Sequence, residues 1–107
     1  MKQYIKSANP KYMSLTSLIG TGEENATSMR ELARLCSTSC REIRKTIERA
    51  RTDGEIICSS DAGYYIPSCR SELVEYYTRT RFRILTSLGT ISAIEKYLEE
   101  ESDDVDK

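Results

Sequence analysis

Residues 28–54 read SMRELARLCSTSCREIRKTIERARTDG, and two helix starts can be recognised in this segment. Ser28 and Glu31 have the spacing of a capping box, in which the two side chains bind N–H groups that the first turn of a helix leaves free. Ser39 and Glu42 repeat this spacing eleven residues later. So short a separation leaves room only for two short helices with a tight turn between them.

Apolar residues at helical spacing follow both capping boxes, so each helix has one side suited to a protein core. On the first helix this side consists of Met29, Leu32, Ala33 and Cys36. On the second helix it consists of Cys40, Ile43, Ile47 and Ala50. Asp53-Gly54 should end the second helix. Two short helices in this arrangement form a helix-turn-helix.

The segment after Gly54 has the composition of a β-hairpin. β-rich runs occupy 56–58 and 64–66, and the five residues between them, SSDAG, are typical of a hairpin loop. Pro67 should close the second strand. A hairpin that directly follows the second helix of a helix-turn-helix is a wing.

A further helix is expected before this region. It should span residues 10–20, where Pro10 suits the first turn. Its apolar side would consist of Tyr12, Leu15, Leu18 and Ile19. The stretch GTGEENAT at 20–27 is expected to be a polar loop.

A long helix is expected over residues 71–100, where apolar residues recur in steps of three and four. The pattern keeps its phase across Gly89, which favours one continuous helix over a break at that glycine. The apolar stripe either packs back on the preceding domain or pairs with a second copy of the chain, and both alternatives remain open. A homodimer would use Leu73, Tyr77, Ile84, Leu88 and Ile91. Arg79, Arg81 and Arg83 do not share one face, so we interpret them as solvated surface, with contacts to the DNA backbone or interchain salt bridges as alternatives.

Residues 28–67 resemble the winged helix-turn-helix domains of bacterial and phage DNA-binding proteins, especially the N-terminal domain of the biotin-operon repressor. Four pieces carry the resemblance: ELA at 31–33, SCREIRKTI at 39–47, the RxDGxI pattern at 51–56, and GYYI at 63–66. The turn residue of that family is usually glycine, whereas this chain has Ser37. The resemblance implies an α+β, mainly α fold of three helices and a β-hairpin wing, followed here by the long helix.

The resemblance also implies binding of double-stranded DNA, with residues 39–51 lying in the major groove. With Ile43, Ile47 and Ala50 buried, the opposite side of this helix carries cationic groups that suit base edges and phosphates. The candidate DNA contacts are Thr38, Ser39, Arg41, Glu42, Arg44, Lys45, Arg49, Ser59 and Ser60. Arg49 and Arg51 lie further along the helix, where phosphate contacts are expected.

Other interpretations of the same residues remain. A charged helix face commonly does no more than face water. The wing tip has no Lys or Arg, although a wing on phosphates normally carries a cation. A winged helix can also be a protein interaction or adaptor module without DNA binding, and the acidic end of the chain would suit that role. A small transcriptional regulator or a phage replication-associated factor is the preferred function.

The composition excludes several chemistries. The 107 residues include no His, which excludes Ser-His-Asp and Cys-His catalysis. We expect no enzyme activity, no cofactor and no metal, because no phosphate-binding glycine loop or metal-ligand cluster is visible. The four cysteines, Cys36, Cys40, Cys58 and Cys69, are expected to be reduced and partly buried, with metal binding, disulfide formation or redox use as alternatives.

Charge is divided unevenly along the chain. Residues 95–107 hold seven acidic and two basic residues, whereas residues 1–94 hold fourteen Lys or Arg against ten Asp or Glu. A basic body of this kind permits polyanion binding. The expected organisation is a winged domain at 1–70, a helix at 71–100 and a disordered acidic tail at 101–107. We expect a cytoplasmic protein, nucleoid-associated if it binds DNA, because no apolar run resembles a signal peptide or a membrane span.

Overall fold

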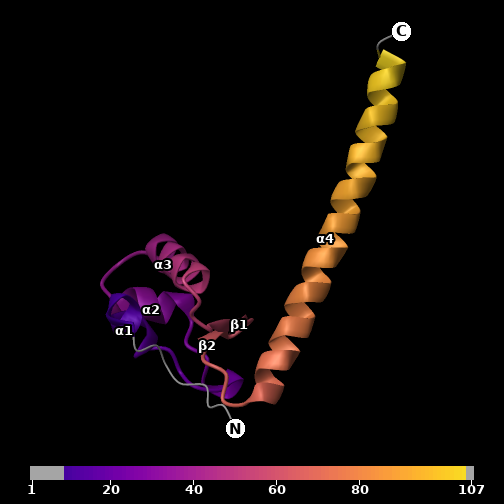
Figure 1. Ribbon diagram of the computed structural model, residues 1–107. Coiled ribbons are helices and arrows are strands. Elements are labelled where there is room, and N and C mark those ends of the chain that lie inside the picture. Colours follow the sequence, from indigo (N-terminus) through magenta and orange to yellow (C-terminus); the bar gives the residue numbers. More distant parts are fainter. Residues whose placement is uncertain (1–8, 106–107) are drawn as a thin grey trace. The chain divides into compact units, whose positions relative to one another are not determined.

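The computed structural model describes residues 9–105, with side chains for residues 9–101. The predicted α+β, mainly helical class is confirmed (Figure 1). The elements, in chain order, are α1 Pro10–Thr16, the 3-10 helix η1 Glu23–Asn25, α2 Met29–Leu35, α3 Cys40–Thr52, β1 Cys58–Ser60, β2 Gly63–Tyr65 and α4 Arg70–Val105. The chain divides into two compact units, which meet between Tyr76 and Tyr77, inside α4.

Helix α1 is shorter than the sequence predicts. Asn9 caps it by accepting a hydrogen bond from the N–H of Lys11 at 3.0 Å, and Pro10 occupies the first turn as expected. The helix ends at Thr16, after which the backbone tightens and the N–H of Ile19 bonds the carbonyl of Thr16. This tighter winding leaves Ile19 buried and Leu18 exposed, so the expected place of Leu18 in the apolar side was wrong.

Both predicted capping serines act as helix caps. The Ser28 hydroxyl accepts from the N–H of Glu31 at 3.1 Å, and the Ser39 hydroxyl accepts from the N–H of Glu42 at 3.2 Å. These bonds satisfy N–H groups that a helix cannot pair internally, which is why α2 and α3 begin where they do.

The turn between α2 and α3 depends on Ser37. Its φ of 51° is positive, and the N–H of Thr38 then reaches back to the carbonyl of Ala33 at 2.9 Å. This is the hydrogen bond of a Schellman motif, which usually has glycine at the left-handed position. Gly54, with a φ of 98°, ends α3 in the same way, as the sequence predicts.

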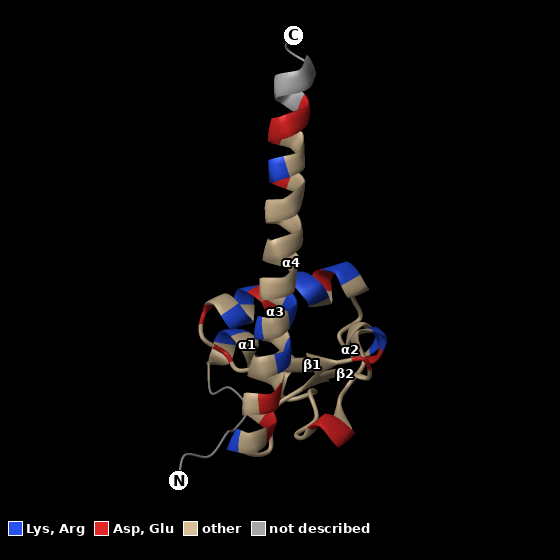
Figure 2. Ribbon diagram, turned by 90° about the vertical axis from the view of Figure 1, so that its right-hand side faces the viewer, with Lys and Arg blue, Asp and Glu red and all other residues tan. Residues whose placement is uncertain are grey.

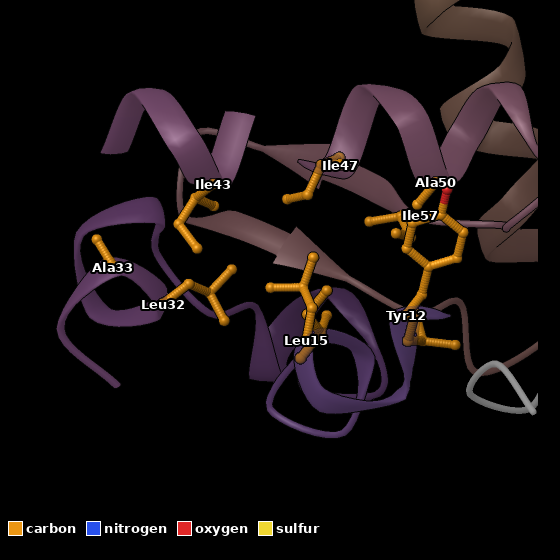
Figure 3. Close-up of a cluster of buried hydrophobic side chains, with 10 residues drawn as sticks. Tyr12, Leu15, Leu32, Ala33, Ile43, Ile47, Ala50 and Ile57 are labelled. Atoms are coloured by element: carbon orange, nitrogen blue, oxygen red, sulfur yellow. The ribbon is translucent and has the colours of Figure 1, made fainter. Parts of the chain in front are cut away.

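One hydrophobic core holds the helices and the hairpin together (Figure 3). Residues from α2 and α3 fill it as predicted, except that Met29 is only partly buried against it and Cys36 and Cys40 are exposed. Both cysteines flank the turn between the two helices. Cys36 is the C-cap residue of α2 and Cys40 is the first residue of α3, so neither side chain reaches the core. The core consists of Tyr12, Leu15, Ile19, Leu32, Ala33, Ile43, Ile47, Ala50, Ile57 and Ile66.

The hairpin is displaced from its predicted position. Strands β1 and β2 pair antiparallel, with Cys58 opposite Tyr65 and Ser60 opposite Gly63. Only Asp61 and Ala62 remain between the strands, so the predicted five-residue loop was wrong. The Ser60 hydroxyl accepts the N–H of Ala62 at 3.2 Å and thereby closes a shorter turn.

Strand β2 has a second neighbour, which the sequence does not indicate. Thr27 forms an antiparallel bridge with Tyr64, and Thr21 forms a parallel bridge with Ile66. The N–H groups of Thr27 and Gly22 donate to the carbonyls of Tyr64 and Ile66. The segment 20–27, expected to be a free polar loop, therefore covers the outer edge of β2.

Helix α4 is continuous through Gly89, as favoured from the sequence. Its first turns belong to the N-terminal unit, because the Glu72 carboxylate accepts from the N–H groups of Glu23 and Ser68. The N-terminal unit therefore extends past the expected boundary at residue 70. The helix also continues to Val105, through most of the tail for which disorder is predicted, because no glycine or proline follows Gly89 to end it. Residues 106–107 of that tail lie outside the described residues.

Candidate nucleic-acid interface

The side of α3 opposite the core is exposed and rich in cations. Burial of Ile43, Ile47 and Ala50 fixes the rotation of the helix. The seven predicted contact residues of this region, Thr38, Ser39, Arg41, Glu42, Arg44, Lys45 and Arg49, are all exposed. Figure 2 marks the Lys and Arg positions along the α3 ribbon in blue. We call Arg41, Lys45 and Arg49, which follow one another at intervals of four residues, the α3 cation row.

Few of these charges are neutralised by neighbours. Lys45 lies 4.0 Å from the Glu42 carboxylate, at the outer limit of an ion pair. Arg49 donates to the hydroxyl of Thr46 at 3.3 Å. Arg41 has no hydrogen bond or ion pair with the part of the chain that the structure describes. Arg41, Lys45 and Arg49 are thus available to an anionic partner.

Arg44 lies on one flank of α3, beside the start of α2. Its guanidinium approaches the sulfur of Met29 at 3.8 Å. On α2, Arg34 forms a short ion pair with Glu31 at 2.5 Å. That hydrogen-bonded guanidinium lowers the pKa of Glu31 from its usual value. Arg44 can reach an anion next to the cation row, whereas Arg34 is already paired.

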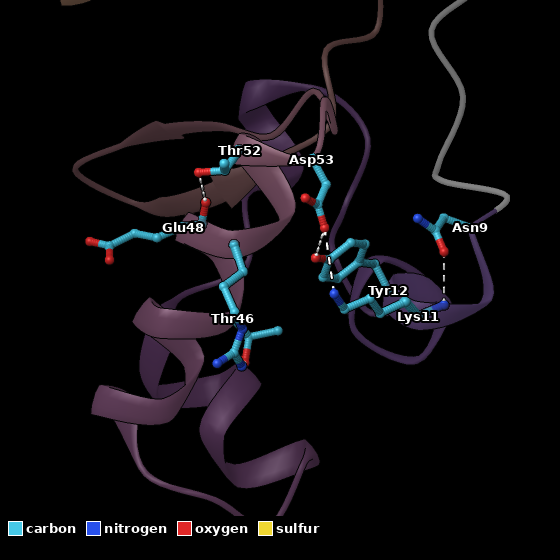
Figure 4. Close-up of polar contacts among 8 residues, drawn as sticks. Asn9, Lys11, Tyr12, Thr46, Glu48, Thr52 and Asp53 are labelled. Atoms are coloured by element: carbon cyan, nitrogen blue, oxygen red, sulfur yellow. Dashed lines mark hydrogen bonds and ion pairs between the residues drawn. The ribbon is translucent and has the colours of Figure 1, made fainter.

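The C-terminal end of α3 is anchored to α1 (Figure 4). The Tyr12 hydroxyl donates a short hydrogen bond to the Asp53 carboxylate, and the ammonium group of Lys11 lies 3.6 Å from the same oxygen. The hydrogen bond from Tyr12, together with the Lys11 charge, lowers the pKa of Asp53. The same bond to Asp53, with burial, raises the pKa of Tyr12. This contact fixes where α3 ends relative to α1.

Beside this anchor, a shallow depression separates α1 from the exposed side of α3. Its lining carries both signs of charge, with three basic and two acidic side chains. It is lined by Lys11, Lys45, Glu48, Arg49, Thr52 and Asp53.

Arg51 has a structural role, which the sequence did not reveal. Its Nε donates to the carbonyl of Ile57 at 2.9 Å, and its guanidinium carbon lies 5.7 Å from the ring centre of Tyr64. It also donates to the hydroxyl of Tyr76 at 3.3 Å. Arg51 thus connects α3 to the hairpin and to the start of α4, and Nε and one terminal nitrogen of this guanidinium already have partners within the chain.

The hairpin brings no cation to the surface near α3. Ser59 and Ser60, expected in the wing loop, lie within β1 and are partly buried. The exposed turn contains Asp61 and Ala62 instead. A groove between this hairpin and the start of α2 is lined by Ser28, Met29, Arg51, Ser59, Ser60, Asp61, Ala62, Gly63 and Tyr64. Any nucleic-acid contact from the hairpin would have to use backbone N–H groups or hydroxyls.

The residues predicted for a dimer divide between the two units. Leu73 is partly buried in the N-terminal unit, whereas Tyr77, Ile84, Leu88 and Ile91 are exposed on the C-terminal one.

The described side chains form no group of three or more potential metal ligands. Cys58 is buried, and the other three cysteines are exposed, in contrast to the expected partial burial. Of the described helices, none combines the length and apolarity that a bilayer crossing requires.

Comparison with known proteins finds no match for this chain. No family model, no curated protein and no solved structure matches the chain.

Proposed function

We propose that residues 9–76 form a winged helix-turn-helix that binds double-stranded DNA, with α3 as the recognition helix. The observation that carries this proposal is the α3 cation row, which is exposed along a helix whose opposite side is buried. An α-helix fits the major groove, where Arg and Lys on its exposed side can bind guanine and phosphate. A small regulator of transcription or a replication-associated factor would use DNA binding of this kind.

Each part of the surface has a different expected task. Arg41 and Lys45 lie in the first two turns of α3, where a recognition helix contacts base edges. Arg49 and Arg44 are suited to phosphates on either side of the groove. Glu42 can accept from cytosine, at the expense of its long contact with Lys45. Thr38 and Ser39 add hydroxyls at the end of the helix that would enter the groove.

The proposal is tested by fluorescence anisotropy with a labelled random-sequence duplex at about 50 mM salt and at raised salt. The intact chain should bind, and its affinity should fall steeply as salt increases because counterions are released from the phosphates. Arg41→Ala combined with Lys45→Ala should weaken binding roughly 10- to 100-fold and make it less sensitive to salt.

Lys96→Ala provides a matched control, because it removes one exposed cation from α4 and should leave duplex affinity unchanged. Both replaced α3 residues are exposed, so circular dichroism should show an unaltered fold. Absence of binding at about 50 mM salt, or equal binding by the double variant, would overturn the proposal. A protein-binding role without DNA would then be the better interpretation.

A further inference from the structure

Within the C-terminal unit, helix α4 exposes a series of large apolar side chains. The eleven residues 84–94 contain no charged side chain, and every one is exposed. Ile84, Ile91, Ile94 and Leu98 each leave about half of their surface open, at 54%, 49%, 52% and 55%. Figure 2 shows this uncharged stretch between basic and acidic segments of α4. Large apolar side chains exposed together in this number are typical of an interaction site.

One series of large apolar residues along α4 is spaced by seven, which favours another helix as the partner. This series consists of Tyr77, Ile84, Ile91 and Leu98. A second series follows each member by three residues and consists of Thr80, Ser87, Ile94 and Glu101. Two such series form the seam of a coiled coil, in which each side chain fits between side chains of the facing helix.

The order of residues in the two series favours an antiparallel pair of identical helices. In a parallel pair each series meets itself, which places Glu101 against Glu101 of the partner subunit and Ser87 against its own copy. Reversing one helix brings the first series opposite the second. Ile84 then meets Ile94 of the partner subunit, and Ile91 meets Ser87 of the partner subunit. Every polar member of the seam is opposed by a residue of the more apolar series.

Charge along α4 favours the same polarity. Three arginines and no acid lie at 79–83, whereas four glutamates and one lysine lie at 95–101. The residues along one edge of the seam are Arg81, Leu88 and Glu95, again at intervals of seven. In an antiparallel pair Arg81 lies beside Glu95 of the partner subunit at both ends, with the two Leu88 side chains between them. Complementary charge sets the register and orientation of such interfaces.

We propose that the chain forms a homodimer in which residues 77–101 of α4 pair antiparallel, with Ile84 opposite Ile94 and Arg81 beside Glu95 of the partner subunit. This inference concerns α4 alone and does not depend on DNA binding by α3. The dimer also gives the exposed apolar stripe a partner of matched length, since the partner is the same helix.

Sedimentation equilibrium of the full chain tests the association itself. The expected mass is twice the 12.2 kDa of one chain. Ile84→Asp should convert the protein to a monomer, because it places a charge in the seam. A single-chain mass for the unaltered protein at about 100 µM, where even a weak association with a Kd near 10 µM would be visible, would overturn the proposal.

Charge reversal tests the antiparallel register. Arg81→Glu and Glu95→Arg should each raise the dimer dissociation constant about tenfold, because each creates two like-charge contacts. The double variant Arg81→Glu, Glu95→Arg should restore the original affinity. Mixing the two single variants should give heterodimers, in which both contacts are again attractive.

Arg79→Glu and Glu99→Arg serve as matched controls, because both positions face away from the seam. They should leave the dissociation constant within about twofold of the original, because neither position belongs to the proposed seam. Positions 81 and 95 of one helix are about 21 Å apart, too far for a direct effect within the chain. If the single reversals at 81 and 95 act like these controls, or if the double variant is not restored, the antiparallel register is wrong.

Discussion

Ser37 has a backbone conformation that its side chain disfavours. Its φ of 51° lies in the left-handed region, where a Cβ approaches the following carbonyl group. The Schellman hydrogen bonds at the end of α2 require that conformation, since the N–H of Thr38 bonds to Ala33. The turn that orients α3 is thus formed at the expense of local strain in one residue.

Ser37→Gly should stabilise the protein. Glycine adopts a positive φ without steric conflict, so we expect the free energy of unfolding to increase by about 1 kcal/mol. Urea unfolding followed by circular dichroism measures the change. Ser37→Ala is the control and should give no gain, because it keeps the Cβ; equal gains from both variants would show that strain at Ser37 is not the cause.

The Tyr12–Asp53 contact predicts a specific dependence of stability on pH. The pKa of Asp53 is lowered, so its contact stabilises the fold above the ordinary value of 3.8 and is lost as pH falls through the lowered pKa. The pKa of Tyr12 is raised, so the contact is present below 10.0 and is lost as pH rises through the raised pKa.

Tyr12→Phe should remove this dependence while keeping the ring in the core. The difference in unfolding free energy between the two proteins should be largest near neutral pH and decline in strong acid and in strong base. Urea titrations across that range measure it. A difference that stays constant with pH would show that Tyr12 contributes only through packing.

Among the elements, β2 is the one most dependent on its neighbours. Gly63 has a φ of 137°, and a Cβ built there would lie 2.3 Å from the carbonyl oxygen of Thr27. The close approach exists because Thr27 and Tyr64 exchange both of their backbone hydrogen bonds. Gly89 differs completely, because a Cβ on it would meet nothing within 4 Å.

Alanine at these two glycines should therefore have opposite effects. Gly63→Ala should destabilise the N-terminal unit by roughly 1–3 kcal/mol, because the strand must move away from Thr27. Gly89→Ala should stabilise α4 by about 1 kcal/mol, since alanine is the better helix former. Thermal unfolding of both variants measures the signs; a loss at Gly89 would show that something packs against that side of α4.

For the whole molecule, the two units draw their stability from different sources. The N-terminal unit has its own core, whereas the described side chains of α4 from Tyr77 to Glu101 are exposed apart from the partly buried Thr80. A single helix in water is only marginally stable. If α4 pairs with a second copy, the stability of its helical structure depends on protein concentration, whereas the stability of α3 does not.

Hydrogen exchange at two protein concentrations should show this difference. Amides of residues 77–101 should exchange more slowly at the higher concentration, and Ile84→Asp should abolish the protection. Amides of α3 are the internal control and should exchange at the same rate at both concentrations. Protection of 77–101 that is independent of concentration would indicate that α4 is stabilised within one chain.

The sequence alone was sufficient to locate the helices of the N-terminal unit and to place the α3 cation row on an exposed side. Ser28, Ser39 and Gly54 act on backbone groups within a few residues, and burial of Ile43 and Ile47 follows from their spacing. Interactions of this range are determined by neighbouring residues, so they can be recognised before the fold is known.

Only the tertiary structure decided which side chains are engaged in contacts within the fold. Arg51 bonds Ile57 and Tyr76, and the Tyr12 hydroxyl meets Asp53, 41 positions away in the sequence. The edge contact of Thr27 with β2 likewise joins segments that no local pattern connects. These contacts arise because packing of the core brings distant residues together, and a cation held in such a contact cannot be distinguished by sequence from one that faces solvent.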